Sequence, residues 1–224
     1  MRVHVEALFA HDAEGHLVRV NEPAGAPAAR FFLGRTAGGP VWRFRHDVDH
    51  DLRSELASAA EDDAFRERVL EPISPSRYED ILARTAPIQR TWVGPAFCFP
   101  DELPAATGAV LVTEGDAQLL RPLLHAWIPD VPLSQPMFAL AVDGHAVAVC
   151  CSVRRTSLAH EAGVETAPPY RGRGYAALVV TAWARAVRDM GRVPLYSTSW
   201  QNEASRAVAR KLALIRFGSD LHIT

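Results

Sequence analysis

The sequence has few cysteines, no long apolar run and little net charge, and each absence excludes a class of protein. Three cysteines among 224 residues form no CxxC pair and no disulfide framework. No stretch approaches the roughly 18 apolar residues of a membrane helix, and the N-terminus meets acidic residues too early for a signal peptide. A net charge of −2 gives no general attraction to nucleic acid or anionic membranes. We therefore expect a cytoplasmic protein with reduced thiols that binds neither nucleic acid nor a membrane.

What is present is enough apolar sequence, 48% of residues, for one sizeable core or two small ones. The N-terminal part predicts about four antiparallel strands. Strands over 3–11 and 16–22 meet at Ala13-Glu14-Gly15, and strands over 29–36 and 41–47 meet across Gly38-Gly39-Pro40. Helical periodicity begins at Asp51, where Asp49 or Asp51 can cap the helix, and recurs over 64–70 and 76–84.

Residues 93–107 are rich in proline and small residues, which predicts a covering loop or a domain boundary. We therefore predict a β-rich N-terminal region over 1–95 and a second domain over 96–224. The second domain alternates strands and helices. Its predicted strands cover 109–113, 137–142, 145–153, 161–166, 195–200 and 215–223, with a hairpin at Asp143-Gly144. Its predicted helices cover 116–127, capped by Asp116, then 175–190, stopped at Gly191, and 203–214.

The segment TAPPYRGRGYA, residues 166–176, carries the strongest chemical signal in the chain. Pro168 and Pro169 stiffen the exit of a predicted strand, and Gly172 and Gly174 then open a long amphipathic helix. The first N–H groups of a helix have no partner inside it and, together with the helix dipole, favour an anion. Glycine lets the backbone approach a phosphate closely. The segment therefore predicts a diphosphate cradle.

Two other interpretations of the same glycines stay open. Gly172, Gly174 and Ala177 also satisfy the dinucleotide fingerprint G-x-G-x-x-[G/A]. That fingerprint normally sits on the first strand–helix turn of its domain, with an acidic residue about 20 positions later, whereas here the positions around Ser197 are not acidic. The simpler alternative is that the glycines only shape a turn.

The motif Arg171-Gly172-Arg173-Gly174-Tyr175-Ala176 resembles the GNAT-superfamily pattern [QR]-x-x-G-x-[GA]. A second segment, PLYSTSWQNEASRAVARKLALIRFG, resembles the later part of the same signature: a strand, Asn202 opening a helix, and Ser205 one turn on. The resemblance covers residues 107–224. It implies an α+β fold with a mixed sheet, the GNAT acyl-CoA N-acyltransferase fold, to which residues 1–95 would be an extension.

The resemblance implies an acetyl-CoA-dependent N-acetyltransferase in which an amine attacks the thioester directly, with acetyl-CoA as co-substrate and no metal. The pantetheine arm would pair with the strand that ends at Thr166, and the diphosphate would bind the loop N–H groups. The implied cofactor-binding residues are Val164, Glu165, Thr166, Arg171, Gly172, Arg173, Gly174, Tyr175, Ala176, Asn202 and Ser205. Asn202 is explained equally well as a simple helix cap. A non-enzymatic acyl-CoA-binding sensor is the alternative function.

A base must deprotonate the acceptor, because an ammonium cannot attack. Glu161 and Glu165 share one face of the predicted strand, and we predict them as catalytic carboxylates. The simpler alternative is that both are exposed strand residues. His160, on the opposite face, is the weaker candidate. Where many GNAT enzymes carry an acidic tyrosine this chain has Ala209, so Ser205 or Tyr196 would have to assist the leaving thiolate, unless it leaves unaided.

The run from His46 to Asp51 could invite a metal by composition, but its place between a strand and a helix favours capping and solvated side chains. We therefore predict no metal site. Ala213 stands where the family usually has glycine. The amine acceptor is unknown from the sequence, and a homodimer is left open.

Overall fold

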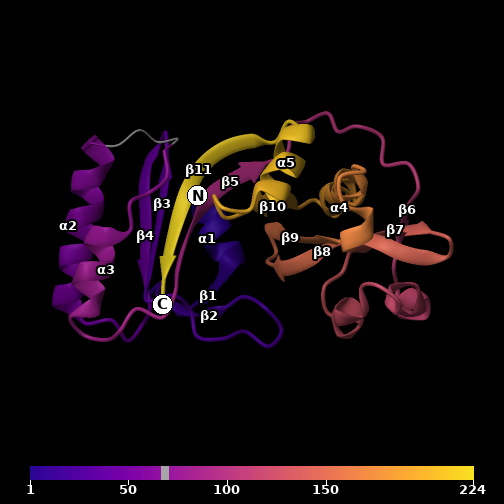
Figure 1. Cartoon of the computed structure of the whole chain (residues 1–224). Coiled ribbons are helices and arrows are strands. Elements are labelled where there is room, and N and C mark those ends of the chain that lie inside the picture. The colour runs from indigo at the N-terminus through magenta and orange to yellow at the C-terminus, as the bar shows by residue number, and fades with distance from the viewer. Residues whose placement is uncertain (67–70) are drawn as a thin grey trace. The chain divides into compact units, whose positions relative to one another are not determined.

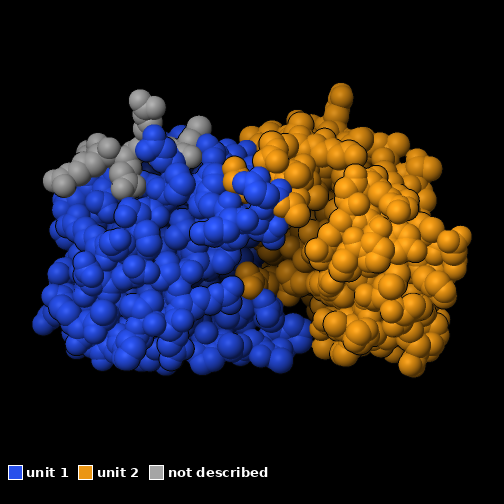
Figure 2. Space-filling model, in the orientation of Figure 1, with its two compact units in different colours: residues 1–97, 197–203, 216–224 blue, residues 98–196, 204–215 orange. Residues whose placement is uncertain are grey.

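The computed structural model describes residues 1–66 and 71–224, and these form two compact units (Figures 1 and 2). Unit 1 comprises residues 1–97, 197–203 and 216–224, and unit 2 comprises residues 98–196 and 204–215. Two segments near the C-terminus thus pack with the N-terminal part of the chain. Sequence composition does not predict that these two segments belong to unit 1.

Unit 1 is built on a sheet with the strand order β4-β3-β11-β5. Strands β3 (Phe31–Thr36) and β4 (Gly39–Phe44) form the antiparallel hairpin predicted from the glycine turn, and β11 (Ile215–Ile223) pairs antiparallel with β3. Helices α2 (His50–Arg66) and α3 (Ser76–Ala83), both predicted as helical, cover one face. Residues 64–66, predicted to begin a separate helix, are the end of α2. The last part of the helix predicted over 64–70, residues 67–70, lies outside the described residues.

The two faces of this sheet use alternate residues of β3. Phe31 and Leu33 pack under α2 and α3 with Leu56, Tyr78 and other buried residues. Phe32 points to the opposite face, because successive side chains of a strand alternate. There it packs with α1 (Arg2–Leu8) and with the hairpin of β1 (Phe9–His11) and β2 (Leu17–Val20).

The strand predicted over residues 3–11 is wrong for most of its length, because residues 2–8 form helix α1. The apolar residues fit both periods: Val5 and Leu8 lie three residues apart and are both buried on one helical face. Glu6, Ala7 and Leu8 also have good helix propensity. Only Phe9–His11 is extended, and it pairs with β2 across the predicted turn.

The loop predicted over residues 93–107 is also wrong at its start, because β5 covers Thr91–Cys98. Gly94 serves close packing here: a Cβ would lie 1.9 Å from the carbonyl oxygen of Thr198. Pro95 supplies no N–H, but its carbonyl accepts the Thr198 N–H at 3.3 Å. Glycine and proline therefore mark a close contact between β5 and Thr198, and not the end of the strand.

Unit 2 is a sheet with the order β10-β9-β8-β7-β6. Strands β6 (Ala109–Leu111), β7 (Met137–Val142), β8 (His145–Arg155) and β9 (Ala159–Thr166) are antiparallel neighbours, and β10 (Val193–Ser197) runs parallel to β9. Helix α4 (Tyr175–Asp189) packs on one face, over β7, β8 and β9. Helix α5 (Glu203–Lys211) follows β10. The predicted mixed α/β fold is confirmed.

The helix predicted over 116–127 is instead two short 3-10 helices, η1 (Glu114–Leu120) and η2 (His125–Asp130). Pro122 separates them, because it has no N–H for a continuing helix. Asp116 is not the N-cap. Its carboxylate reaches back to the backbone N–H of Thr113 at 3.0 Å and to its hydroxyl at 2.6 Å.

None of the helices in residues 1–66 and 71–224 combines the length and the apolar character of a membrane span.

Candidate active site

The loop between β9 and α4 has the backbone that its glycines allow. Residues Pro168–Tyr170 form a single 3-10 turn, and Gly172 (φ +77°) and Gly174 (φ +83°) then lie in the left-handed region. Gly174 is the N-cap of α4, with no side-chain cap on the helix. Other residues rarely adopt this conformation. The first backbone N–H groups of α4 are therefore not taken up by a capping side chain.

Three cationic side chains surround this loop. Arg171 donates from Nε to the carbonyl of Thr166 at 3.1 Å, and the Arg173 guanidinium lies over the Tyr170 ring at 5.2 Å. Lys211, at the end of α5, reaches Gly174 so closely that a Cβ there would lie 2.3 Å from its Nζ. It is the single lysine of the sequence. The sequence carries no signal that brings Lys211 to Gly174, because the two lie 37 residues apart.

Strand β9 loses its partner on one side as it approaches this loop. In the described chain, β10 pairs with β9 at Ala159, His160 and Glu161. Beyond Glu161, the residues Val164, Glu165 and Thr166 pair with β8 on the other side, opposite Cys150, Val149 and Ala148. The edge of β9 that leads to Gly172 and Gly174 is therefore not covered by β10.

Glu161 and Glu165 lie on one face of β9, as predicted, with Gly163 between them. Glu165 stands opposite Val149 and Gly163 opposite Cys151, both in the core under η1 and η2. Glu161 is 2% exposed, whereas Glu165 is half-buried. The Trp127 indole of η2 donates from Nε1 to Glu165 Oε2 at 2.6 Å. The two carboxylates thus differ in accessibility.

Asn202 and Ser205 are placed in different units. Asn202 is exposed in the turn before α5, and its N–H donates to the Ser199 carbonyl at 3.1 Å within unit 1. Ser205 belongs to α5 in unit 2, as does the loop, and its Oγ lies 2.6 Å from the Tyr196 hydroxyl. Burial raises the pKa of Tyr196 to about 12. Tyr196 is therefore a weak acid that is already engaged with Ser205.

Comparison with known proteins identifies the segment that holds this site. Residues 138–216 match the family model of the GNAT acetyltransferases. The resemblance inferred from the two motifs is confirmed, and the matched segment includes β9, the glycine loop, α4 and α5. No curated protein matches the sequence.

Two solved GNAT structures share the fold. A GNAT-family protein from Novosphingobium aromaticivorans has 21% identity and a TM-score of 0.52; the match covers 61% of this chain and 65% of that one, just under two thirds. A GNAT-family acetyltransferase from Colwellia psychrerythraea has 11% identity and a TM-score of 0.52, with 82% and 75% covered. At these identities the likeness concerns the fold alone.

The two departures from the GNAT pattern have distinct structural consequences. Ala209, in place of the tyrosine, is 2% exposed in α5. Ala213, in place of the glycine, has φ +50°, a left-handed conformation that residues with a Cβ seldom adopt. Ala213 thus adopts a conformation that favours glycine.

His160 lies on the face of β9 opposite Glu161, as predicted, and its environment is closed. Its Nδ1 is 2.9 Å from Ser152 Oγ, which also accepts a hydrogen bond from the Trp183 indole at 2.9 Å. Burial, together with the nearby charges of Arg155 and Arg192, lowers the pKa of His160 to about 4. At neutral pH this histidine is an uncharged member of a core hydrogen-bond network.

Outside the GNAT segment, one group of possible metal ligands occurs in the described residues: Asp12, Glu14 and His16. Both imidazole nitrogens of His16 already have partners, Asp12 at 3.1 Å and Arg53 at 2.6 Å. The run from His46 to Asp51 behaves as a turn and cap, since Asp49 accepts the Asp51 N–H at 2.9 Å. The prediction that no metal is bound stays a prediction.

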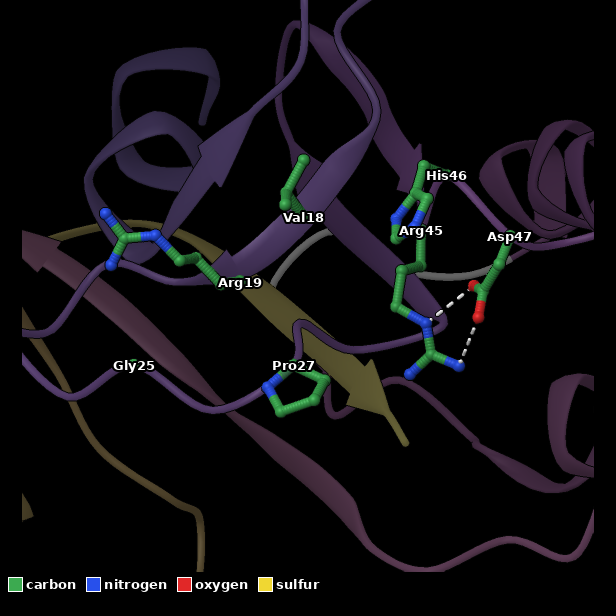
Figure 3. A pocket seen from close by; sticks show the side chains of 7 residues that line it. All are labelled: Val18, Arg19, Gly25, Pro27, Arg45, His46 and Asp47. Carbon is green, nitrogen blue, oxygen red and sulfur yellow. Dashed lines mark hydrogen bonds and ion pairs between the residues drawn. The ribbon is translucent and has the colours of Figure 1, made fainter.

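Unit 1 contains a pocket of about 450 Å³ lined by Val18, Arg19, Gly25, Pro27, Arg45, His46 and Asp47 (Figure 3). Arg45 is one of two arginines that line it. Figure 3 shows the Arg45 guanidinium bonded to both oxygens of Asp47, and these bonds are 2.6 and 3.1 Å long. Its third nitrogen donates to the Ala28 carbonyl at 3.1 Å. No predicted site residue lines this pocket. The charge of Arg45 is paired with Asp47, and Arg19 donates to the Glu22 carbonyl at 3.3 Å.

Proposed function

We propose that this protein is an acetyl-CoA-dependent N-acetyltransferase that transfers the acetyl group to an amine by direct attack within a ternary complex. The observation that carries the proposal is the junction at the end of β9. There a strand that has parted from β10 runs into two left-handed glycines at the start of α4, inside the segment that matches the GNAT model.

The glycine loop supports a diphosphate site by its charge and its backbone. The N-terminus of α4 carries a partial positive charge and unpaired N–H groups. Arg171, Arg173 and Lys211 add three cations around it, and residues 166–176 contain no acidic side chain. Lys211 stands beside a helix N-terminus, an unfavourable place for a cation unless an anion binds there. The diphosphate of acetyl-CoA is an anion of suitable charge.

The uncovered edge of β9 supports binding of the pantetheine arm along Val164, Glu165 and Thr166, whose pairing on the other side is complete. Amide groups of the arm would pair with backbone groups of this edge. Holding the thioester and an amine in one site supplies most of the rate gain by proximity and orientation.

In the chemical step a neutral amine nitrogen forms a bond to the thioester carbon, the carbon–sulfur bond breaks, and the thiolate takes up a proton. We propose Glu165 as the group that accepts the amine proton. Glu161 is the other predicted carboxylate, and its 2% exposure favours Glu165 as the one that meets an acceptor. With Ala209 in place of a tyrosine, the thiolate leaves with help from solvent or unaided.

The rival function is a non-enzymatic acyl-CoA sensor, which Ala209 favours because it removes a leaving-group acid. We expect release of free thiol when the protein is mixed with acetyl-CoA and a panel of primary amines, amino acids and peptides, monitored with a thiol reagent. Thiol release that depends on both protein and amine supports the transferase. Binding of acetyl-CoA without release across the panel would support the sensor.

The replacement Gly174→Val tests the diphosphate site. We expect acetyl-CoA to bind roughly 10- to 100-fold more weakly, because a β-branched side chain at φ +83° distorts the loop, displaces Lys211 and removes charge-assisted hydrogen bonds. The dissociation constant is measured by titration calorimetry. A ¹³C-dimethyl label on Lys211, resolved from the terminal amine, should shift on acetyl-CoA addition in the unmutated protein.

Gly191→Val is the matched control, because Gly191 has φ +71° at the other end of α4 with open space around its Cβ position. It carries the same backbone strain without touching the loop, so it should lower stability and leave acetyl-CoA affinity unchanged. If Gly174→Val binds as tightly as the control while folded, the diphosphate does not bind at this loop.

A further inference from the structure

Trp127 and Glu165 form a contact that the proposed reaction does not by itself require. The indole N–H lies 2.6 Å from Glu165 Oε2, although 38 residues separate the two in sequence. An indole N–H can only donate and does not titrate, so this bond suits the charged carboxylate. Within the described residues it is the one side-chain hydrogen bond of Glu165, which leaves Oε1 without a protein donor.

The indole is itself held firmly. Trp127 packs against the core of unit 2, and its backbone N–H donates to Leu124 at 3.0 Å. Leu124 and Leu120, which anchor this segment, are 2% and 0% exposed. Because the Trp127 ring is packed in this way, it can restrict the orientation of the Glu165 carboxylate.

Gly163 provides the space for this arrangement. A Cβ at Gly163 would lie 3.3 Å from Trp127 Cη2 and 2.2 Å from Val153 Cγ1. The indole therefore lies over the bare backbone between Glu161 and Glu165, on the face that carries both carboxylates. A side chain at 163 would clash with Val153 and crowd the edge of the ring that binds Glu165.

We infer that Trp127 is a positioning residue, which holds the Glu165 carboxylate so that its second oxygen, Oε1, meets the acceptor amine. This inference rests on the proposed function. A half-buried glutamate with free rotamers would spend much of its time in unproductive orientations, and a misplacement of about 1 Å can cost 100-fold in rate. With Oε2 held by the indole, the orientation of Oε1, the oxygen that would accept the proton, is defined.

The test replaces Trp127 with phenylalanine, which keeps an aromatic ring and deletes the N–H donor. We expect kcat to fall roughly 10- to 100-fold with acetyl-CoA affinity unchanged. Trp183→Phe is the matched control: it also deletes one indole hydrogen bond in unit 2, to Ser152 Oγ and not to a carboxylate. Its kcat should stay within about 2-fold of the unmutated protein at a temperature where both variants are folded.

A double-mutant cycle separates positioning from general damage. In a Glu165→Ala background, Trp127→Phe should cause no further loss of kcat, because the group on which it acts is gone. Equal losses in both backgrounds, or no loss in the single variant, would overturn the inference while leaving the proposed function intact. An unmutated protein that acetylates no amine would instead overturn the proposed function, and this inference with it.

Discussion

Replacement of Glu165 by glutamine is expected to lower kcat by about 100- to 10,000-fold, the usual range for loss of a general base. Glutamine keeps the shape of the side chain and can still accept the Trp127 hydrogen bond, but it cannot take a proton from the amine. Acetyl-CoA binding should be unaffected, because the proposed contacts of residue 165 with the cofactor are made by its backbone. Steady-state kinetics with the best amine of the panel, alongside calorimetric titration of acetyl-CoA, measures both quantities.

Glu161→Gln is the control for this prediction, since Glu161 lies on the same face two strand repeats away and is 2% exposed. We expect it to change kcat less than 10-fold and to act mainly on stability. If the larger loss came from Glu161→Gln, the base would be the buried carboxylate. If neither variant lost activity, deprotonation by solvent before binding would replace the proposed base.

The parts of the fold that the sequence predicted are those with local signals. The Asp143-Gly144 hairpin has both residues at positive φ, 50° and 78°, which a tight turn between antiparallel strands requires. The parts that it missed depend on distant partners. The apolar residues in 3–8 fit both the period of a strand and that of a helix. Packing against the sheet of unit 1 favours the helix. Gly94 in β5 has the residue type of a loop signal, whereas the close approach of the Thr198 carbonyl explains it.

For the site, the sequence predicts the loop at Gly172 and Gly174, because glycine is the residue that most readily adopts a left-handed backbone conformation. Nothing in the spacing of the chain indicates Lys211 beside Gly174 or Trp127 beside Glu165. These pairs join elements that meet only when the sheet of unit 2 is assembled. The cofactor and catalytic roles of the predicted residues, and the division of domains at residue 95, stay predictions.

The second large effect concerns Asp220, a buried carboxylate in β11 of unit 1. It is 0% exposed, and its Oδ2 lies 3.2 Å from His4 Nε2 and 2.8 Å from His222 Nε2. We expect Asp220→Ala to lower the free energy of unfolding by about 3–5 kcal/mol, because it removes one partner from a buried polar group and strands the others. Urea unfolding followed by circular dichroism measures the loss. Asp12→Ala, where the side chain is 26% exposed, is the control with a smaller effect.

The pH dependence of stability gives this prediction a second, charge-specific readout. Burial alone would raise the pKa of Asp220, but His4 and His222 outweigh it and hold the pKa at about 2. A carboxyl whose pKa is depressed on folding stabilises the protein above its unfolded value, near 3.9, and that contribution is lost as pH falls toward about 2. The unmutated protein should therefore lose about 2 kcal/mol more than Asp220→Asn between pH 4 and pH 2. Parallel curves for the two proteins over this window would show that Asp220 is not held as a carboxylate between the two histidines.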